Sequence, residues 1–491
     1  MTDTTAKAPL RVLHVITGLA AGGAEEQLRL LLPRLADHGV SSEVAVFYHA
    51  GSVAQALRAE GIAVTDLHSP GFWDRRAVAR LSGLIRAGGY DVVHTHLFRS
   101  GLHGRIAARR AGVRALVHTE HSLNPVLIEG RRRNPAIDRL YRWAERRGTV
   151  TVAVSDAVAH ELSGLGVRPE RIRVLPNGID PAQLAYDPEE RAAFRAEHGL
   201  AEDDFVVLCL GRLAASKRLD LAIGAVADIP AERRPHVRLL VVGAGEELAA
   251  LTELAELRLP GRVVFTGELP GARLAAALSA SDLLLSPSPE ETFGMAVLSA
   301  AAVGLPVAFA SCPALSELGL VELDAQKSVP PAPARFEAGQ ADPVPVGSSQ
   351  AGATAVGAGQ VKLLATVPRQ GTPGSGNLNV SDPRHSETNQ AERDRALPLQ
   401  WISGTQGSLV RAIERALAAQ DATGAGSGAG GPAERRPTAE LAAALHGYGI
   451  ESIAERLAQL YRELPGLPSG GSDPQDNDRI SQGRRVGVHH V

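Results

Sequence analysis

Short apolar runs alternate with amphipathic stretches over the first third of the chain, and this alternation predicts a doubly wound α/β domain. The strand candidates are Arg11–Thr17, Glu43–Tyr48, Ala63–Leu67, Asp91–His94, Ala115–His118 and Val150–Val154. Helical patterns lie between them, near residues 24–38, 52–60, 74–87, 99–111, 134–147 and 156–164. This order of elements is typical of a mostly parallel sheet with helices on both faces.

The same rhythm starts again later in the chain and predicts a second domain of the same kind. A strand candidate at Ile172–Leu175 and the turn segment Pro176–Asp180 end the first unit. The later strand candidates are Phe205–Leu210, Val237–Val242, Val263–Thr266, Leu283–Ser286 and Pro306–Ala310. We therefore expect two tandem Rossmann-like domains, at residues 1–180 and 181–321, whose sheets meet at an interdomain cleft.

The rhythm stops after about residue 321. Residues 322–406 are rich in Pro, Gly, Ala, Ser and Gln, and this composition predicts a disordered insertion. Apolar periodicity returns in residues 407–464, which are expected to form helices that complete the fold. Residues 465–491 are polar and are predicted to be a disordered tail.

Composition excludes some functions. The chain has 491 residues and a formal net charge of −3, which argues against a nucleic-acid-binding protein. There is no apolar run of about 18 residues and no clear signal peptide, so a cytoplasmic location is expected. Two cysteines, Cys209 and Cys312, lie in apolar surroundings and fit a reducing compartment.

Lysine is rare in this chain. Lys7, Lys217, Lys327 and Lys362 are its only four lysines, so arginine is the usual cation. Lys217 lies just after the predicted strand Phe205–Leu210, close to Arg212. Both cations could point into one crevice and neutralise a diphosphate without a metal ion. A solvated basic loop is the alternative.

Two loops between a strand and a helix could bind an anion. In the second domain, Glu291, Phe293 and Gly294 precede an apolar helical segment that begins at Met295, and the first amides of a helix suit a phosphate. In the first domain, Gly22-Gly23 follows the first strand, without the G-x-G-x-x-G spacing of a nicotinamide enzyme. Simple dipole partners before a helix, or a glycine turn needed only for packing, are the alternatives.

Five histidines cluster in the first domain, at positions 94, 96, 103, 118 and 121. His94 and His96 would share one face of a strand end, which raises the question of a zinc site. We expect no metal, because no carboxylate or cysteine ligand has suitable spacing beside them. His121 follows a strand end and could hydrogen-bond to a substrate, although a histidine that only caps a loop is an alternative.

A basic segment lies at Arg131–Arg147. Its arginines are interleaved with Tyr141 and Trp143 on a predicted helix. Such a surface could contact anionic lipid headgroups at the inner membrane face, and a merely solvated helix is the alternative.

Taken together, these motifs resemble the family 4 retaining glycosyltransferases of GT-B architecture. The matching segments are His14–Gly18 with Gly22–Glu25, Asp91–His96, His118–His121, Ala153–Ser155, Leu175–Asp180, Gly211–Arg218, Val242–Gly245, Glu291–Met295 and Gly304–Val307. The resemblance covers about residues 10–320 and the final helices, of which the last, Ser452–Tyr461, would cross back to the first domain.

The resemblance implies an enzyme that moves a sugar from a nucleotide-diphosphate donor to an acceptor hydroxyl with retained configuration. It implies that Arg212 and Lys217 bind the diphosphate, that Glu291 meets the sugar hydroxyls, and that amides from Phe293 through Gly294 to Met295 meet sugar and phosphate. Gly22 and Gly23 would approach the diphosphate, and His121 would lie beside the transferred sugar. No metal and no further cofactor are expected. The acceptor (a glycan, a lipid-linked or a small molecule) stays unknown.

The chain departs from the family pattern at Ser299, where the family has a glutamate that binds the nucleotide ribose. Serine is shorter and uncharged, so this contact would be weaker or water-mediated. A catalytically weak sugar- or nucleotide-binding protein is therefore the alternative function. A sugar-nucleotide epimerase is disfavoured, because the sequence shows no suitable acid/base set.

Overall fold

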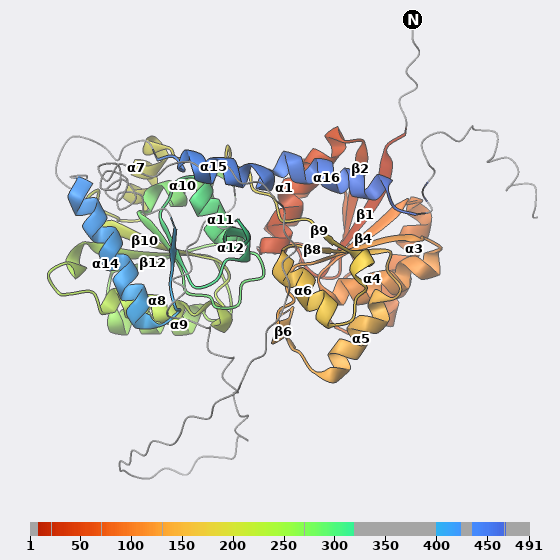
Figure 1. Cartoon of the computed structure of the whole chain (residues 1–491), viewed down its shortest axis with the longest axis horizontal. Coiled ribbons are helices and arrows are strands. Elements are labelled where there is room, and N and C mark those ends of the chain that lie inside the picture. The colour runs from red at the N-terminus through yellow and green to blue at the C-terminus, as the bar shows by residue number, and fades with distance from the viewer. Residues whose placement is uncertain are drawn as a thin grey trace, which may run out of the picture. The chain divides into compact units, whose positions relative to one another are not determined.

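The structure is a computed structural model that describes residues 8–318 except 21, 70, 130 and 270, and residues 399–423, 435–465 and 467. Within these residues the chain forms two large parallel sheets, each with helices on both sides (Figure 1). We call the part built on the first sheet the N-terminal lobe and the part built on the second sheet the C-terminal lobe.

The sheet of the N-terminal lobe has seven parallel strands in the order β3-β2-β1-β4-β5-β8-β9. They are β1 Leu10–Ile16, β2 Val40–Val46, β3 Val64–Asp66, β4 Val92–His96, β5 Ala115–Glu120, β8 Val150–Ala153 and β9 Ile172–Val174. The predicted strands are confirmed. The small antiparallel pair β6 Leu127–Ile128 and β7 Arg131–Arg132 was not predicted.

Helices cover both faces of this sheet because each face of its strands is apolar. They are α1 Gly23–Asp37, α2 Ser52–Ala59, α3 Arg75–Gly88, α4 Phe98–Ala111, α5 Pro135–Glu145 and α6 Asp156–Gly164, with the short turn η1 Pro169–Arg171. One core joins β1 and β2 to α1 and α2, and a second core joins the opposite face to α3 and α4. Burial of such apolar side chains is the main stabilising contribution.

The sheet of the C-terminal lobe has six parallel strands in the order β12-β11-β10-β13-β14-β15. They are β10 Phe205–Leu210, β11 Val237–Val242, β12 Val263–Gly267, β13 Leu283–Ser286, β14 Val307–Phe309 and β15 Leu399–Trp401. Its helices are α7 Pro188–Glu197, α8 Leu219–Ala227, α9 Leu248–Arg258, α10 Ala272–Ala280, α11 Met295–Ala302, α12 Pro313–Glu317, α14 Gln406–Thr423 and α15 Ala439–Leu445, with the turns η2 Ala215–Lys217, η3 Arg234–His236 and η4 His446–Tyr448.

One domain boundary differs from the sequence prediction. Residues 399–401 fall inside the segment predicted as a disordered insertion, 322–406, yet they form β15 and pair in parallel with β14. The prediction was wrong for this end of the segment, because a strand of three residues is too short to show a period. The rest of the predicted insertion up to residue 398, and the predicted tail from residue 468 onward, lie outside the described residues.

The last helix, α16 Ile450–Arg462, belongs to the core of the N-terminal lobe, as predicted. Ile453, Leu457 and Tyr461 are buried in the same cluster as α1 and β1, and Figure 1 shows α16 (blue) beside α1 (red). Arg34 of α1 pairs with Asp180 at 2.7 Å and with Glu451 at 3.1 Å. The N-terminal lobe is therefore completed by residues far away in sequence. No helix of the described residues is long and apolar enough to cross a membrane.

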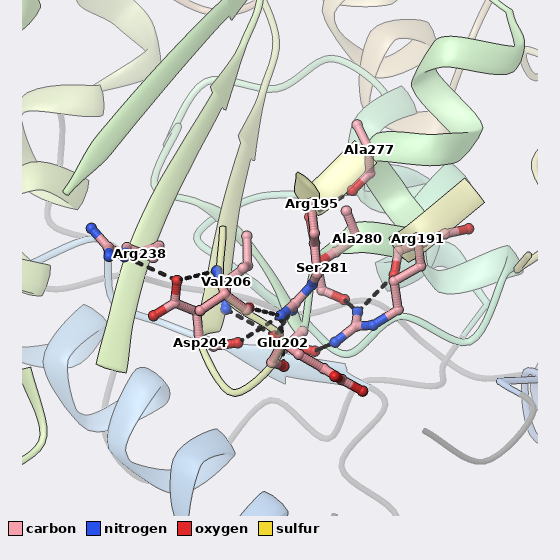
Figure 2. A network of polar contacts seen from close by, with 12 residues as sticks. Arg191, Arg195, Glu202, Asp204, Val206, Arg238, Ala277, Ala280 and Ser281 are labelled. Atoms are coloured by element: carbon pink, nitrogen blue, oxygen red, sulfur yellow. Dashed lines mark hydrogen bonds and ion pairs between the residues drawn. The ribbon is translucent and has the colours of Figure 1, made fainter. Parts of the chain in front are cut away.

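A buried charge network holds the strand-entry end of the C-terminal lobe. Three arginines surround the carboxylate of Asp282, which precedes β13: Arg191 at 3.0 Å, Arg195 at 2.8 Å and Arg435 at 2.8 Å. Figure 2 shows Arg191 and Arg195 reaching toward backbone carbonyls, among them those of Ala280 and Ser281. These carbonyls accept the guanidinium hydrogens that the single carboxylate cannot satisfy.

This network fixes α7, β13 and the segment around Arg435 to one point. Burial alone would raise the pKa of the Asp282 carboxyl, but the three guanidinium groups together hold that pKa below its ordinary value. Because the folded pKa is lowered, the ionised carboxylate stabilises the fold above its unfolded pKa of about 3.9, and this contribution is lost as the pH falls through the folded value.

We therefore expect Asp282→Asn to lower the free energy of unfolding at pH 7 by about 3–5 kcal/mol, because it leaves buried guanidinium groups without their counter-charge. Chemical denaturation of both proteins over a pH series measures this difference, which should shrink below about pH 4. Asp421→Asn is the matched control: it breaks an exposed pair with Arg233 and should cost less than about 1 kcal/mol. A pH-independent difference would contradict this account of Asp282.

Candidate active site

The loop between β13 and α11 has a backbone that requires glycine at its last position. Gly294 precedes α11 with φ +96°, a left-handed conformation that side chains disfavour. A Cβ atom at this position would lie 2.5 Å from Cys312 Sγ, so no larger residue fits. Gly294 supplies no side-chain cap, and the first amides of α11 point out of the helix without a side-chain acceptor among the described residues. This helix start suits an anion.

Beside this loop, the structure brings two of the predicted residues into direct contact. Lys217 ends the turn η2, which follows β10, and Glu291 follows the neighbouring strand β13. Lys217 Nζ lies 2.5 Å from Glu291 Oε1, and both side chains are only partly exposed, at 29% and 16%. A cation and a carboxylate are thus held together at the carboxyl edge of the sheet, where open α/β sheets bind ligands.

The glycine loop of the N-terminal lobe lies against the same helix start. A Cβ atom on Gly23 would lie 3.6 Å from Met295 Cγ, an ordinary van der Waals distance. A Cβ atom on Gly22 would collide with the carboxylate of Glu25. Two of the predicted donor-binding positions, Gly23 and Met295, are therefore adjacent although they are far apart in the sequence.

Thr292 links the loop that carries Glu291 to His121 of the N-terminal lobe. The sequence analysis gave Thr292 no role. Its hydroxyl donates a hydrogen bond to the carbonyl oxygen of His121 at 2.6 Å. Its own carbonyl accepts one from the Ser155 hydroxyl at 2.8 Å. These contacts place the backbone of His121 next to the loop that carries Glu291. A small hydroxyl residue between Glu291 and Phe293 was the available signal in the sequence.

Glu25 is a second residue whose chemistry the sequence did not reveal. Its carboxyl is partly buried at the start of α1, and desolvation raises its pKa to about 7. The charge of Arg212 acts in the opposite direction, while Glu129 and Glu268 raise the pKa further. Arg212, which is exposed, is thus near enough to influence the glycine loop. Glu25 can exchange a proton near neutral pH.

Two other predicted positions face the core. Phe293 is 3% exposed, and its ring lies 5.8 Å from that of Tyr448. Ser299 is 8% exposed within α11. The helix therefore carries a short, buried hydroxyl where the resemblance leads one to look for a long carboxylate.

The five histidines singled out in the sequence occupy three different environments. His103 lies near Phe47, Phe72 and Trp73. His118 Nε2 lies 3.5 Å from a carboxylate oxygen of Glu120. The other three gather near His14, and ring nitrogens of residues 14, 94 and 96 lie within 4.8 Å of one another, a spacing that could hold a metal ion.

The basic segment is only in part the surface that the sequence predicted. Tyr141 is 1% exposed and donates a hydrogen bond to Glu120 at 3.1 Å, so it belongs to the core, a correction to the predicted aromatic surface. Arg133 is neutralised by Asp138 and Glu161. The exposed part consists of Arg132, Arg139, Arg142, Trp143 and Arg146.

Two family models match the two lobes. The model described as Glycosyltransferase Family 4 matches residues 21–183, and the model described as Glycosyl transferases group 1 matches residues 190–318. The matched ranges include the glycine loop in the first case, and Lys217, Glu291 and α11 in the second.

Similar proteins include D-inositol 3-phosphate glycosyltransferases. That of Mycobacteroides abscessus is 35% identical over 246 residues, which are 48% of this chain and 54% of the relative. That of Acidothermus cellulolyticus is 34% identical over 260 residues, 47% of this chain and 54% of the relative. The chain thus spans about half the length of the curated relatives it matches.

Solved structures share the fold. Anabaena HepE in complex with UDP and glucose has a TM-score of 0.54 and 25% identity, over 63% of this chain and 83% of that one. Sucrose-phosphate synthase from Thermosynechococcus elongatus has a TM-score of 0.61 at 18% identity, over 92% of this chain and 98% of that one, a likeness of fold alone. With one family model on each Rossmann-like lobe, the chain belongs to the family 4 glycosyltransferases of GT-B architecture.

Proposed function

We propose that this protein transfers a sugar from a nucleotide-diphosphate donor to an acceptor hydroxyl. The observation that carries the proposal is the contact between Lys217 and Glu291 beside the uncapped start of α11. A cation and free amides suit a diphosphate, and a carboxylate suits the hydroxyls of a sugar. Both lie at the carboxyl edge of one parallel sheet.

The electrostatics of this site match the charge that builds up during transfer. As the bond from the anomeric carbon to the phosphate oxygen breaks, negative charge grows on the leaving diphosphate. Lys217, Arg212 and the first amides of α11 would stabilise that charge. Without a ligand, Lys217 is paired with Glu291, so the donor diphosphate must draw the ammonium group toward itself. Glu291 then becomes free to accept hydrogen bonds from the sugar.

We further propose that the reaction retains configuration and requires no divalent ion. The acceptor oxygen would attack the anomeric carbon from the face that the diphosphate leaves, and a phosphate oxygen would take the acceptor proton. Two cations and a helix start provide the positive charge that a metal ion supplies in other transferases. His121 would lie beside the transferred sugar, since its backbone adjoins the loop that carries Glu291.

UDP-sugars are the first donors to test, because the HepE structure binds UDP and glucose. Inositol phosphates are the first acceptors to test, because of the names of the sequence relatives. The alternative function, a binding protein of weak activity, is favoured by one observation, the short buried Ser299 in α11. Donor binding without release of nucleotide would support this alternative.

The role of Lys217 predicts that Lys217→Ala lowers turnover on the order of 100-fold, because a charged contact to the leaving group is lost. Release of nucleotide from UDP-sugars, measured with and without acceptor, provides the rate. Thermal shifts with the same donors report binding separately from chemistry. Near-normal turnover in Lys217→Ala would refute the assignment.

Glu291 can be separated from its neighbour Glu290 by matched variants. Glu291→Gln keeps the shape, loses the negative charge and frees Lys217, so turnover should fall about 10- to 100-fold while UDP alone binds at least as tightly as before. Glu290 is exposed, and Glu290→Gln should change neither quantity appreciably. Equal effects of the two variants, or a loss of UDP binding in Glu291→Gln, would contradict the role given to Glu291.

We also propose peripheral contact with anionic membranes through the exposed part of the basic segment. Arg139 and Arg142 are exposed on α5. Trp143, which follows Arg142, is 40% exposed. The double variant Arg139→Glu with Arg142→Glu should bind phosphatidylglycerol vesicles at least 10-fold more weakly in a sedimentation assay, at about 1 kcal/mol per charge removed. Phosphatidylcholine vesicles are the control. Equal binding of wild type and variant would remove the proposal.

A further inference from the structure

Three imidazole rings form a continuous chain across the sheet of the N-terminal lobe. His14 Nδ1 lies 3.1 Å from His96 Nε2, and His96 Nδ1 lies 3.2 Å from His121 Nε2. Both distances are those of hydrogen bonds. The chain runs from β1 through β4 to the residue that follows β5.

The parallel strands place these rings on one face. In the sheet β4 lies between β1 and β5, and His96 is paired with Ile16 on one side and with Thr119 on the other. His14 and His121 are each two residues away from those partners, so side-chain alternation turns all three rings to the same face. A step of one residue in any strand would break the chain.

The candidate metal group, His14, His94 and His96, is poorly arranged to bind an ion. The ring of His94 is stacked on that of His96, with centroids 4.2 Å apart and planes at 29°. The lone pairs of an imidazole lie in the plane of its ring, so nearly parallel stacked rings cannot aim them at one point. Both nitrogens of His94 are also engaged, by the Tyr461 hydroxyl at 2.6 Å and by the Thr119 hydroxyl at 2.7 Å.

The lowered pKa values of all three rings favour the neutral form near pH 7. Burial lowers the pKa of His14 to about 3 and that of His121 to about 4, and burial together with the neighbouring histidines lowers the pKa of His96 well below its ordinary value. A neutral imidazole has one N–H and one acceptor nitrogen. Three rings therefore supply three protons, and the two contacts between rings use two of them.

The third proton must lie at one end of the chain, on His14 Nε2 or on His121 Nδ1. Both atoms are buried and lack a hydrogen-bond partner among the described residues. A buried N–H without a partner is rarer than a buried acceptor without one. His14 is 0% exposed, whereas His121 is 9% exposed and adjoins the loop of Glu291 through Thr292. Of the two ends, the His121 end is therefore the one next to the candidate site.

We propose that His14 and His96 are positioning residues that hold His121 as its Nδ1–H tautomer, so that His121 donates a hydrogen bond to an oxygen atom of the bound sugar donor. His14 Nδ1–H donates to His96 Nε2, and His96 Nδ1–H donates to His121 Nε2. The ligand part of this inference rests on the proposed function. The tautomer part stands on the ring geometry alone.

The Nδ1–H tautomer limits what His121 can do. A ring whose Nε2 already accepts a hydrogen bond and whose Nδ1 carries the proton has no free lone pair for the acceptor hydroxyl. His121 is therefore a donor that orients an oxygen atom, and not a general base. The acceptor proton must leave by another route, such as the phosphate oxygen of the donor.

The test is long-range ¹H–¹⁵N NMR of the full chain labelled in its histidine rings, with the His121 signals assigned through His121→Gln. The proposal expects His121 in the Nδ1–H form without ligand, and a shift of that N–H on addition of UDP-glucose. An Nε2–H form in the wild type would overturn it. A metal ion bound stoichiometrically to the purified protein would overturn it as well.

Two variants test whether the tautomer of His121 depends on the row of histidines His14–His96–His121 or on other nearby contacts. His14→Phe keeps a ring but removes the first donor, so His121 should become a mixture of both tautomers and kcat should fall about 3- to 10-fold with little change in KM. Tyr461→Phe is the control, because it removes a contact of His94 and leaves the chain His14–His96–His121 intact. An unchanged His121 tautomer in His14→Phe would overturn the proposal.

The contact of His121 with the sugar and the tautomer of His121 can be tested separately. If His121→Gln keeps full turnover while the wild type shows the Nδ1–H form, the assigned place of His121 beside the sugar is wrong and the tautomer assignment stands. If turnover falls in His121→Gln but the wild type shows the Nε2–H form, His121 acts in the reaction and the positioning role of His14 and His96 is wrong.

Discussion

The contact between Lys217 and Glu291 depends on the order of the strands. The two residues are separated by more than 70 positions in the sequence, but β10 and β13 are neighbours in the sheet and run in the same direction. Their loops therefore leave the sheet at one edge, and a cation from the first loop meets a carboxylate from the second. The same rule places the glycine loop and His121 at the corresponding edge of the other sheet. Candidate chemistry gathers where parallel strands end.

The polar groups at the two ends of the C-terminal sheet differ in whether they have partners. At the strand-entry end, Asp282 and its three arginines are almost fully supplied with partners, as a buried network must be. At the strand-exit end, the first amides of α11 have no side-chain cap among the described residues, and Arg212 is exposed. Polar groups that have partners stabilise the fold, and polar groups left available suit a ligand.

Much of the fold could be predicted from the sequence, because parallel strands buried on both faces are short, continuous apolar runs. The two lobes and the return of α16 to the first lobe follow from this pattern and from the resemblance. The strand β15 was missed because three residues carry no period, and the pair β6 and β7 because it is shorter still. The burial of Tyr141 was missed because the residue pattern along helix α5 does not reveal that Tyr141 packs against Glu120.

For the candidate site, residue types and strand ends predicted where Lys217 and Glu291 would lie, but not that they touch. The joining role of Thr292 depends on a contact with a carbonyl from the other lobe, which no local pattern encodes. The chain of histidines was also out of reach. His14 lies inside an apolar strand far from the others in sequence, and only the sheet register brings it next to His96.

The place of α16 has a consequence for the order in which the protein can be built during translation. The N-terminal lobe is synthesised first, but the apolar face that Ile453, Leu457 and Tyr461 cover stays open until those residues emerge from the ribosome. The Asp282 network likewise waits for Arg435. The core of the lobe that is translated first is thus completed last. The nascent chain therefore carries an exposed apolar surface through most of its synthesis, and a chaperone would bind at this surface.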